Sequence, residues 1–152
     1  GAQLWEPSDH GLPGPAYAVA VDLRDPDVVH AGTPEGLFVS SDSGTNWSLE
    51  ALPAVEFYRL VQDPGSPAVF FAITDLGLLR STDGGARWSA VAVPSSGQAV
   101  SEVSIAASDP QTVYAATVGG VYRSRNLGET WERVGLTRRT PGQVFRSNGL
   151  PQ

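Results

Sequence analysis

Four acidic residues, Glu35, Glu56, Asp75 and Glu102, are the best candidates for chemistry in this sequence. Cleavage of a glycosidic bond uses two carboxyl groups, roughly 5 to 10 Å apart, whose pKa values differ. The spacing of these four residues predicts that they lie near one end of the fold, although it does not show that they converge. The alternative is that they are solvated loop residues without a catalytic role.

Histidine and cysteine chemistry is poorly supported. His10 and His30 are isolated from each other and from any suitable nucleophile, so neither a His-based triad nor a zinc pattern is indicated. The chain has no cysteine, which excludes disulfides and thiolate metal sites. We therefore expect no metal and no cofactor.

The stretch SSDSGTNW, residues 40–47, has the composition of either a cation loop or a tight turn. Asp42 and Asn46 alone supply too few oxygen ligands for calcium, which takes about 6 to 8. In a turn, the Asp side chain accepts hydrogen bonds from backbone N–H groups, Gly44 adopts unusual dihedral angles and Trp47 begins the next strand.

Repetition of this stretch favours the turn. The pattern S-x-D/N-x-G-x-x-W occurs three times, with starting points 41 and then 43 residues apart. Its members are Ser40, Asp42, Gly44, Trp47, Ser81, Asp83, Gly85, Trp88, Ser124, Asn126, Gly128 and Trp131. Below, the repeated turn means residues 40–47, 81–88 and 124–131.

Between these turns, apolar and polar residues alternate with the period of half-buried strands, and no segment has a convincing helical pattern. Each repeat predicts four strands. The expected strands are 17–22, 28–33, 37–41 and 47–51; 57–62, 68–74, 78–82 and 88–93; and 100–107, 112–117, 121–125 and 131–134.

The pattern resembles the Asp-box, or BNR, repeat of β-propellers, and the resemblance extends from about Trp5 to Trp131. It implies an all-β fold of four-stranded antiparallel blades, in which the box is a structural turn away from the ligand face. We expect one domain over 1–152, with repeats at about 16–51, 56–93 and 99–135. Residues 1–15 and 136–152 are expected to be fragments of a further blade, the first of them a strand at residues 4–8.

Two enzyme families share this box. The sialidases carry an arginine triad and an Arg-Ile-Pro motif, of which Phe57-Tyr58-Arg59-Leu60 is a faint echo with Val61 in place of the Pro. The xyloglucan hydrolases use paired carboxylates between two propellers. Sortilin-type receptors and photosystem II assembly factors have similar repeats and imply a binding role instead.

The working prediction is a noncatalytic propeller module for protein or glycan contact, and the alternative is a fragment of a glycoside hydrolase. Any binding site is expected on the face opposite the boxes, because loops carry binding while repeated strands carry the fold. Its candidate residues are Glu35, Glu56, Asp75, Arg138 and Arg139.

Composition limits the partners. The net charge is −6 and the chain has no Lys-rich run, which argues against nucleic acid binding. No apolar run approaches the ~20 residues of a membrane helix. A closed propeller ring takes about 4 to 8 blades. Because this sequence predicts only three, we expect further blades from a longer chain or from a homo-oligomer. The resemblance also suggests an extracellular or periplasmic location.

Overall fold

The computed structural model describes residue 7 and residues 9–135, which form twelve strands in three sheets. Residues 136–152 of the expected terminal fragments, with Arg138 and Arg139, lie outside these residues, as do residues 1–6 and 8, which include most of the expected strand at 4–8. The strands are β1 (Ala18–Val21), β2 (Val29–Thr33), β3 (Gly36–Ser40), β4 (Ser48–Ala51), β5 (Phe57–Gln62), β6 (Phe70–Thr74), β7 (Gly77–Ser81), β8 (Ser89–Ala90), β9 (Val100–Ile105), β10 (Val113–Thr117), β11 (Gly120–Ser124) and β12 (Glu132–Val134).

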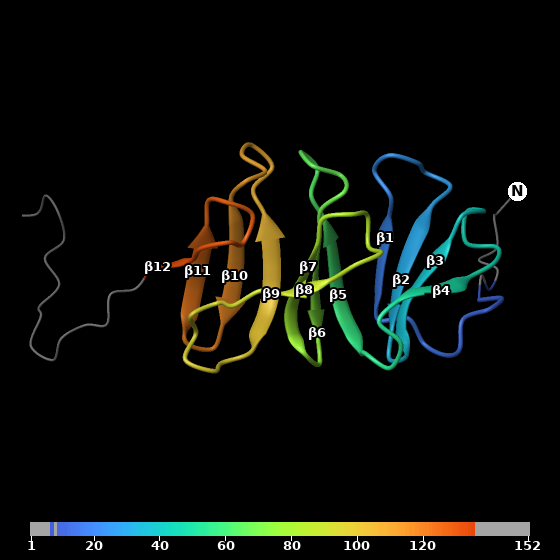
Figure 1. The fold of residues 1–152 in the computed structure, drawn as a ribbon, viewed down its shortest axis with the longest axis horizontal. Coiled ribbons are helices and arrows are strands. Elements are labelled where there is room, and N and C mark those ends of the chain that lie inside the picture. The colour runs from blue at the N-terminus through green and yellow to red at the C-terminus, as the bar shows by residue number, and fades with distance from the viewer. Residues whose placement is uncertain (1–6, 8, 136–152) are drawn as a thin grey trace, which may run out of the picture.

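Each sheet is an antiparallel meander of four strands in sequence order. The three sheets, here the first, second and third blades, stand side by side, with β1, β5 and β9 as their innermost strands (Figure 1). This architecture confirms the prediction of an all-β, propeller-type fold with about three blades. The observed strand ends differ from the predicted ones mostly by one or two residues.

The largest difference is β8, which is much shorter than the predicted strand at 88–93. The backbone of Val91 still donates to the carbonyl of Leu78, but Pro94 has no N–H with which to extend the ladder. The chain therefore leaves the second sheet early and crosses toward β9 (Figure 1).

The core lies between the blades, because each sheet has apolar residues on both faces. Phe71, Leu78 and Val113 belong to a cluster that joins the second and third blades. Leu37 and Phe57 belong to the corresponding cluster between the first and second blades. Each blade is thus stabilised mainly by its neighbours, as in other repeat proteins.

Internal repetition makes blade positions directly comparable. Leu37 of the first blade and Leu78 of the second are 0% and 4% exposed, because the next blade covers them. Val121 stands at the same position of the third blade and is 42% exposed. Among the described residues, the outer face of the third blade is therefore uncovered.

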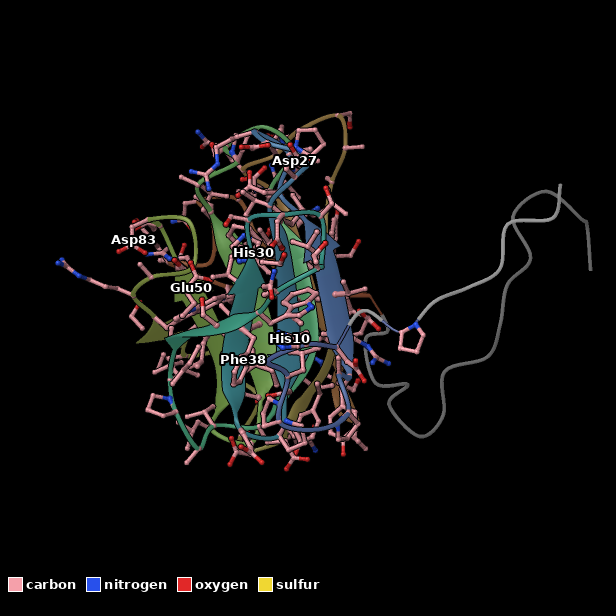
Figure 2. All side chains as sticks on the ribbon, turned by 90° about the vertical axis from the view of Figure 1, so that its right-hand side faces the viewer. His10, Asp27, His30, Phe38, Glu50 and Asp83 are labelled. Carbon is pink, nitrogen blue, oxygen red and sulfur yellow. The ribbon has the colours of Figure 1, made fainter. Side chains whose placement is uncertain are left out.

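The outer face of the first blade is partly covered by the segment that precedes β1. The backbone N–H of Trp47 donates to the carbonyl of His10 at 2.9 Å. Gly11 approaches the Trp47 backbone so closely that a side chain at residue 11 would collide with it. Figure 2 looks onto this face, where Phe38 is only 8% exposed.

Candidate functional site

The repeated turn is held by the same hydrogen bonds in all three blades. In the first, the hydroxyl of Ser40 donates to Asp42 Oδ1 at 2.7 Å and accepts from the backbone N–H of Gly44 at 2.8 Å. Asp42 Oδ1 also accepts from the backbone N–H of Asn46 at 2.8 Å. These bonds close the loop over only a few residues, which explains why a short sequence motif specifies it.

The other two turns repeat this geometry. Asp83 Oδ1 accepts from the backbone N–H of Arg87, and Asn126 Oδ1 accepts from that of Thr130, both at 2.9 Å. The three serines at the start of the turns are about 1% exposed. The acceptor side chains thus bond the backbone of their own turn, as expected from the sequence.

These bonds lower the pKa of Asp42 to about 2, mainly through the side-chain and backbone N–H groups of Asn46. The pKa of Asp83 is also lowered, with the backbone N–H of Arg87 as the main cause. Both carboxylates are exposed to solvent, so the backbone N–H groups that donate to them are not deeply buried. We therefore expect the loss of one acceptor to cost less than the full penalty for a buried unpaired donor.

The three tryptophans of the repeated turns are half-buried. Trp47, Trp88 and Trp131 occupy equivalent positions, each one residue before the last strand of its blade. Each indole N–H donates to a carbonyl of its own turn, at 2.7 to 3.0 Å. Trp88 packs edge-on against Phe57, with ring centroids 5.7 Å apart. The indole rings therefore cover the edge of a blade and do not lie at the centre of the core.

The second and third turns also dock onto the blade before them. A Cβ built on Gly128 would lie 3.0 Å from Phe71 Cε1, and Arg80 Nη1 donates to the carbonyl of Leu127 at 2.6 Å. A Cβ on Gly85 would lie 3.4 Å from Leu37 Cδ2. The turns therefore join neighbouring blades, which is a structural role.

The opposite end of the blades carries the hairpins after β2, β6 and β10 and the loops before β5 and β9. Glu56 and Asp75 meet there: each backbone N–H donates across the pair at 3.0 Å, to Asp75 Oδ1 and to the Glu56 carbonyl. The Tyr58 hydroxyl donates to Glu56 Oε2 at 3.0 Å. This bond and the nearby carboxylates raise the pKa of Tyr58. Leu76 and Val118, at the hairpin tips, are 65% and 93% exposed.

The remaining carboxylate candidates stand elsewhere. Glu102 on β9 faces Arg59 on β5, with Oε2 and Nε 3.7 Å apart and both side chains more than half exposed. Glu35 lies in the hairpin of the first blade, where its carbonyl accepts from the backbone N–H of Ala54. The structure thus brings Glu56 and Asp75 into contact and leaves Glu35 and Glu102 on other blades.

A buried polar cluster at the joint between the first and second blades is absent from the sequence expectations. His30 is 2% exposed, and its Nδ1 and Nε2 lie 2.9 Å from Glu50 Oε2 and 3.4 Å from Asp22 Oδ2. Arg24 donates to both oxygens of Asp22, at 3.0 and 2.6 Å. Alignment of the repeats could have pointed to this cluster, because Phe71 and Tyr114 occupy the position of His30 in the other two blades.

The electrostatics of this cluster are strongly coupled. Hydrogen bonds from Arg24 hold the pKa of Asp22 well below its usual range, against the effect of burial. Burial by itself lowers the pKa of His30, but the hydrogen bond to Glu50 and the charges of Glu50 and Asp22 outweigh it and raise the pKa above 6.5.

Neither end of the blades forms a metal centre in the part of the chain that the structure describes, where no group of three His, Asp or Glu side chains is suited to hold an ion. Within the same residues, no helix is long and apolar enough to cross a membrane.

The fold and the turn-joined blades define the class of protein: this is a β-propeller-type repeat chain. Solved structures agree with this assignment. The match to an ancestral GH74 enzyme has a TM-score of 0.68 and 24% sequence identity, and it covers 81% of this chain and 19% of the enzyme chain. YCF48 from Cyanidioschyzon merolae has a TM-score of 0.61 and 23% identity, with coverages of 80% and 38%. YCF48 bound to D1 peptide has a TM-score of 0.61 and 21% identity, with coverages of 81% and 42%.

Comparison with protein-family models and with curated proteins found no match. The structural similarities, all below 25% identity, establish the propeller fold and no activity. The chain spans about a fifth of the GH74 enzyme and about two fifths of YCF48.

Proposed function

We propose that this chain is a noncatalytic propeller module that contacts protein through the hairpin end of its blades. The observation that carries the proposal is the composition of that end. Leu76, next to Asp75 in the chain, and Val118, in the corresponding hairpin of the third blade, are 65% and 93% exposed. The carboxylates of Glu56 and Asp75 lie at the same end of the blades. Exposed aliphatic side chains near fixed charges suit a protein surface.

The repeated turns support the same proposal, since we infer that they are Asp-box repeats with a structural role. Their polar side chains are hydrogen-bonded within the turn, and the glycines of the second and third turns pack on the preceding blade. This leaves the opposite end of the fold for recognition, with Glu35, Glu56 and Asp75 among its residues. Arg138 and Arg139 remain proposed members of this end. The solved structure of YCF48 bound to D1 peptide is a precedent for protein contact by a similar fold.

The alternative is a fragment of a glycan-active hydrolase, which the similarity to GH74 enzymes and the contact between Glu56 and Asp75 favour. Against it, one oxygen of each carboxylate already accepts a hydrogen bond, from Tyr58 and from the Glu56 backbone. The second oxygen of each carboxylate is left for the proton transfer and nucleophilic attack that hydrolysis requires, so only the activity assay separates the two proposals.

Both proposals are tested with the same set of variants on a peptide array, a glycan array and a xyloglucan hydrolysis assay. The Leu76→Asp and Val118→Asp exchanges are expected to reduce peptide binding at least tenfold. Arg87→Gln is the control, because Arg87 is 93% exposed at the turn end. Hydrolysis that disappears in Glu56→Gln would establish the alternative, and peptide binding unaffected by either hairpin exchange would refute the proposed surface.

A further inference from the structure

The joint between the first and second blades differs from the joint between the second and third. At the second joint, Phe71 fills the space under Gly128 of the following turn. At the first joint, His30 takes the equivalent position, and the edge of its ring meets Phe70 of β6, with centroids 5.0 Å apart. A titratable ring therefore replaces an apolar one at a buried contact between blades.

The charged groups around His30 come from both blades. Asp22 at the end of β1, Arg24 and Asp25 in the following loop, and Glu50 on β4 line a cavity of about 450 Å³. The second blade contributes Asp83 and Gly84 from its repeated turn, and the apolar part of the wall comes from Val28 and Val39. Figure 2 shows His30, Glu50 and Asp83 in this region, seen from the side of the first blade.

The cluster rests directly on the second blade. A Cβ built on Gly84 would lie 2.9 Å from Arg24 Nη2, and one on Gly85 would lie 3.4 Å from Glu50 Oε2. Arg24 and Glu50, which hydrogen-bond to Asp22 and His30, thus pack against two consecutive glycines of the neighbouring turn. A change in the positions of these side chains is transmitted to the joint.

We propose that His30 is a proton-operated clamp at the joint between the first two blades. Its imidazolium donates to Glu50 and Asp22 at once, and this pairing holds β4 and the β1–β2 loop against the turn of the second blade. Loss of the proton leaves the imidazole with a single N–H, so it can donate to only one of the two carboxylates and its charge no longer attracts either of them. Asp22 keeps its hydrogen bonds from Arg24, so the loss falls on the contacts made by His30. The joint then opens more readily.

The direction of the pH effect follows from linkage. The pKa of His30 is higher in the folded chain than its ordinary value of 6.5. Its stabilising contribution is therefore fully present below about pH 6.5 and is lost as the pH rises through the folded value. Since one proton is involved, the opening constant of the joint rises by at most about tenfold per pH unit across this window.

Hydrogen exchange measured by mass spectrometry on the 152-residue chain, corrected for intrinsic rates, tests the clamp between pH 5.5 and 8.5. Opening is expected to increase with pH in peptides from β2, β4 and residues 82–85. Peptides from β10 and from residues 125–128, which belong to the third blade and face the joint between the second and third blades, are the internal control and should change less. Equal changes at both joints would overturn the proposal.

Three variants sharpen the test. His30→Phe, the residue type that the second blade uses, should abolish the pH dependence, and Glu50→Gln should reduce it. His10→Gln is the matched control and should retain it. An unchanged pH dependence in Glu50→Gln would overturn the clamp.

Proton NMR titration of the unaltered chain gives an independent answer even where His30→Phe does not fold. The His30 ring protons should titrate above the ordinary histidine value of about 6.5. Titration of His30 at or below that value would overturn the clamp.

Discussion

Replacement of Phe71 by alanine measures what the contact between blades contributes to stability. Phe71 is 0% exposed and lies in the cluster between the second and third blades, against the turn at Gly128. Truncation of such a side chain removes its transfer free energy and leaves a cavity, so the expected loss is about 3 to 5 kcal/mol. Small domains are stable by only about 5 to 15 kcal/mol, so this loss is a large fraction of the total free energy of unfolding.

Tyr114 provides the matched control, because it occupies the same position in the third blade and no following blade covers it in the part of the chain that the structure describes. It is 36% exposed. Full burial of such a side chain contributes about 1.5 to 3 kcal/mol, and about two thirds of that applies here. Since truncation opens to solvent and leaves no closed cavity, Tyr114→Ala should cost about 1 to 2 kcal/mol.

Urea unfolding, followed by tryptophan fluorescence, measures the loss in free energy of unfolding for both variants, provided that the slope of this free energy against urea concentration is the same in each. The comparison should be made at several protein concentrations, so that any self-association that covers Tyr114 becomes visible. Equal losses for Phe71→Ala and Tyr114→Ala at micromolar protein would refute the reasoning that neighbouring blades bury these positions.

Two further predictions concern the repeated turns. Gly128→Ala should cost about 1 to 2 kcal/mol, because residue 128 has a φ of 85° and the new Cβ would lie 3.0 Å from Phe71. Gly77→Ala is the control for backbone strain alone, since a Cβ at residue 77 meets nothing within 4 Å, and equal urea midpoints for the two variants would exclude a packing role for the turn. Because the pKa of Asp42 is lowered to about 2, the stability that its charge provides is present above about pH 4 and is lost as the pH falls through 2. Asp42→Asn should therefore flatten the acid limb of stability measured by urea unfolding between pH 2 and 5, and an unchanged acid limb would count against the turn bonds.

Local contacts made the repeated turns predictable. Ser40, Asp42 and Gly44 bond one another within four residues, so the geometry of the turn depends little on the rest of the chain. Alternation of apolar residues likewise predicted the strands, and the period of the repeats predicted the blades. The short β8 was missed because its end depends on where the chain must cross to the third blade.

The candidate site was only partly predictable. The sequence placed Glu56 and Asp75 at one end of the blades, because each follows or precedes a recognisable strand. Their mutual hydrogen bonds and the bond from Tyr58 depend on how β5 and β6 pair, including a register shift between Phe57 and Arg59. Such a shift has no clear signature in the sequence.

Other features were decided only by the tertiary structure. Burial of a side chain depends on the neighbouring blade, so Phe71 and Tyr114 differ in exposure although their positions in the repeat are the same. The tryptophans are half-buried because each indole ring lies at the edge of its blade. His30 acquires two carboxylate partners only when β1, β2 and β4 align and the turn of the second blade closes over them. The sequence by itself determined the blades, because their turns and strands are local, whereas packing between blades determined which residues are buried, paired and titratable.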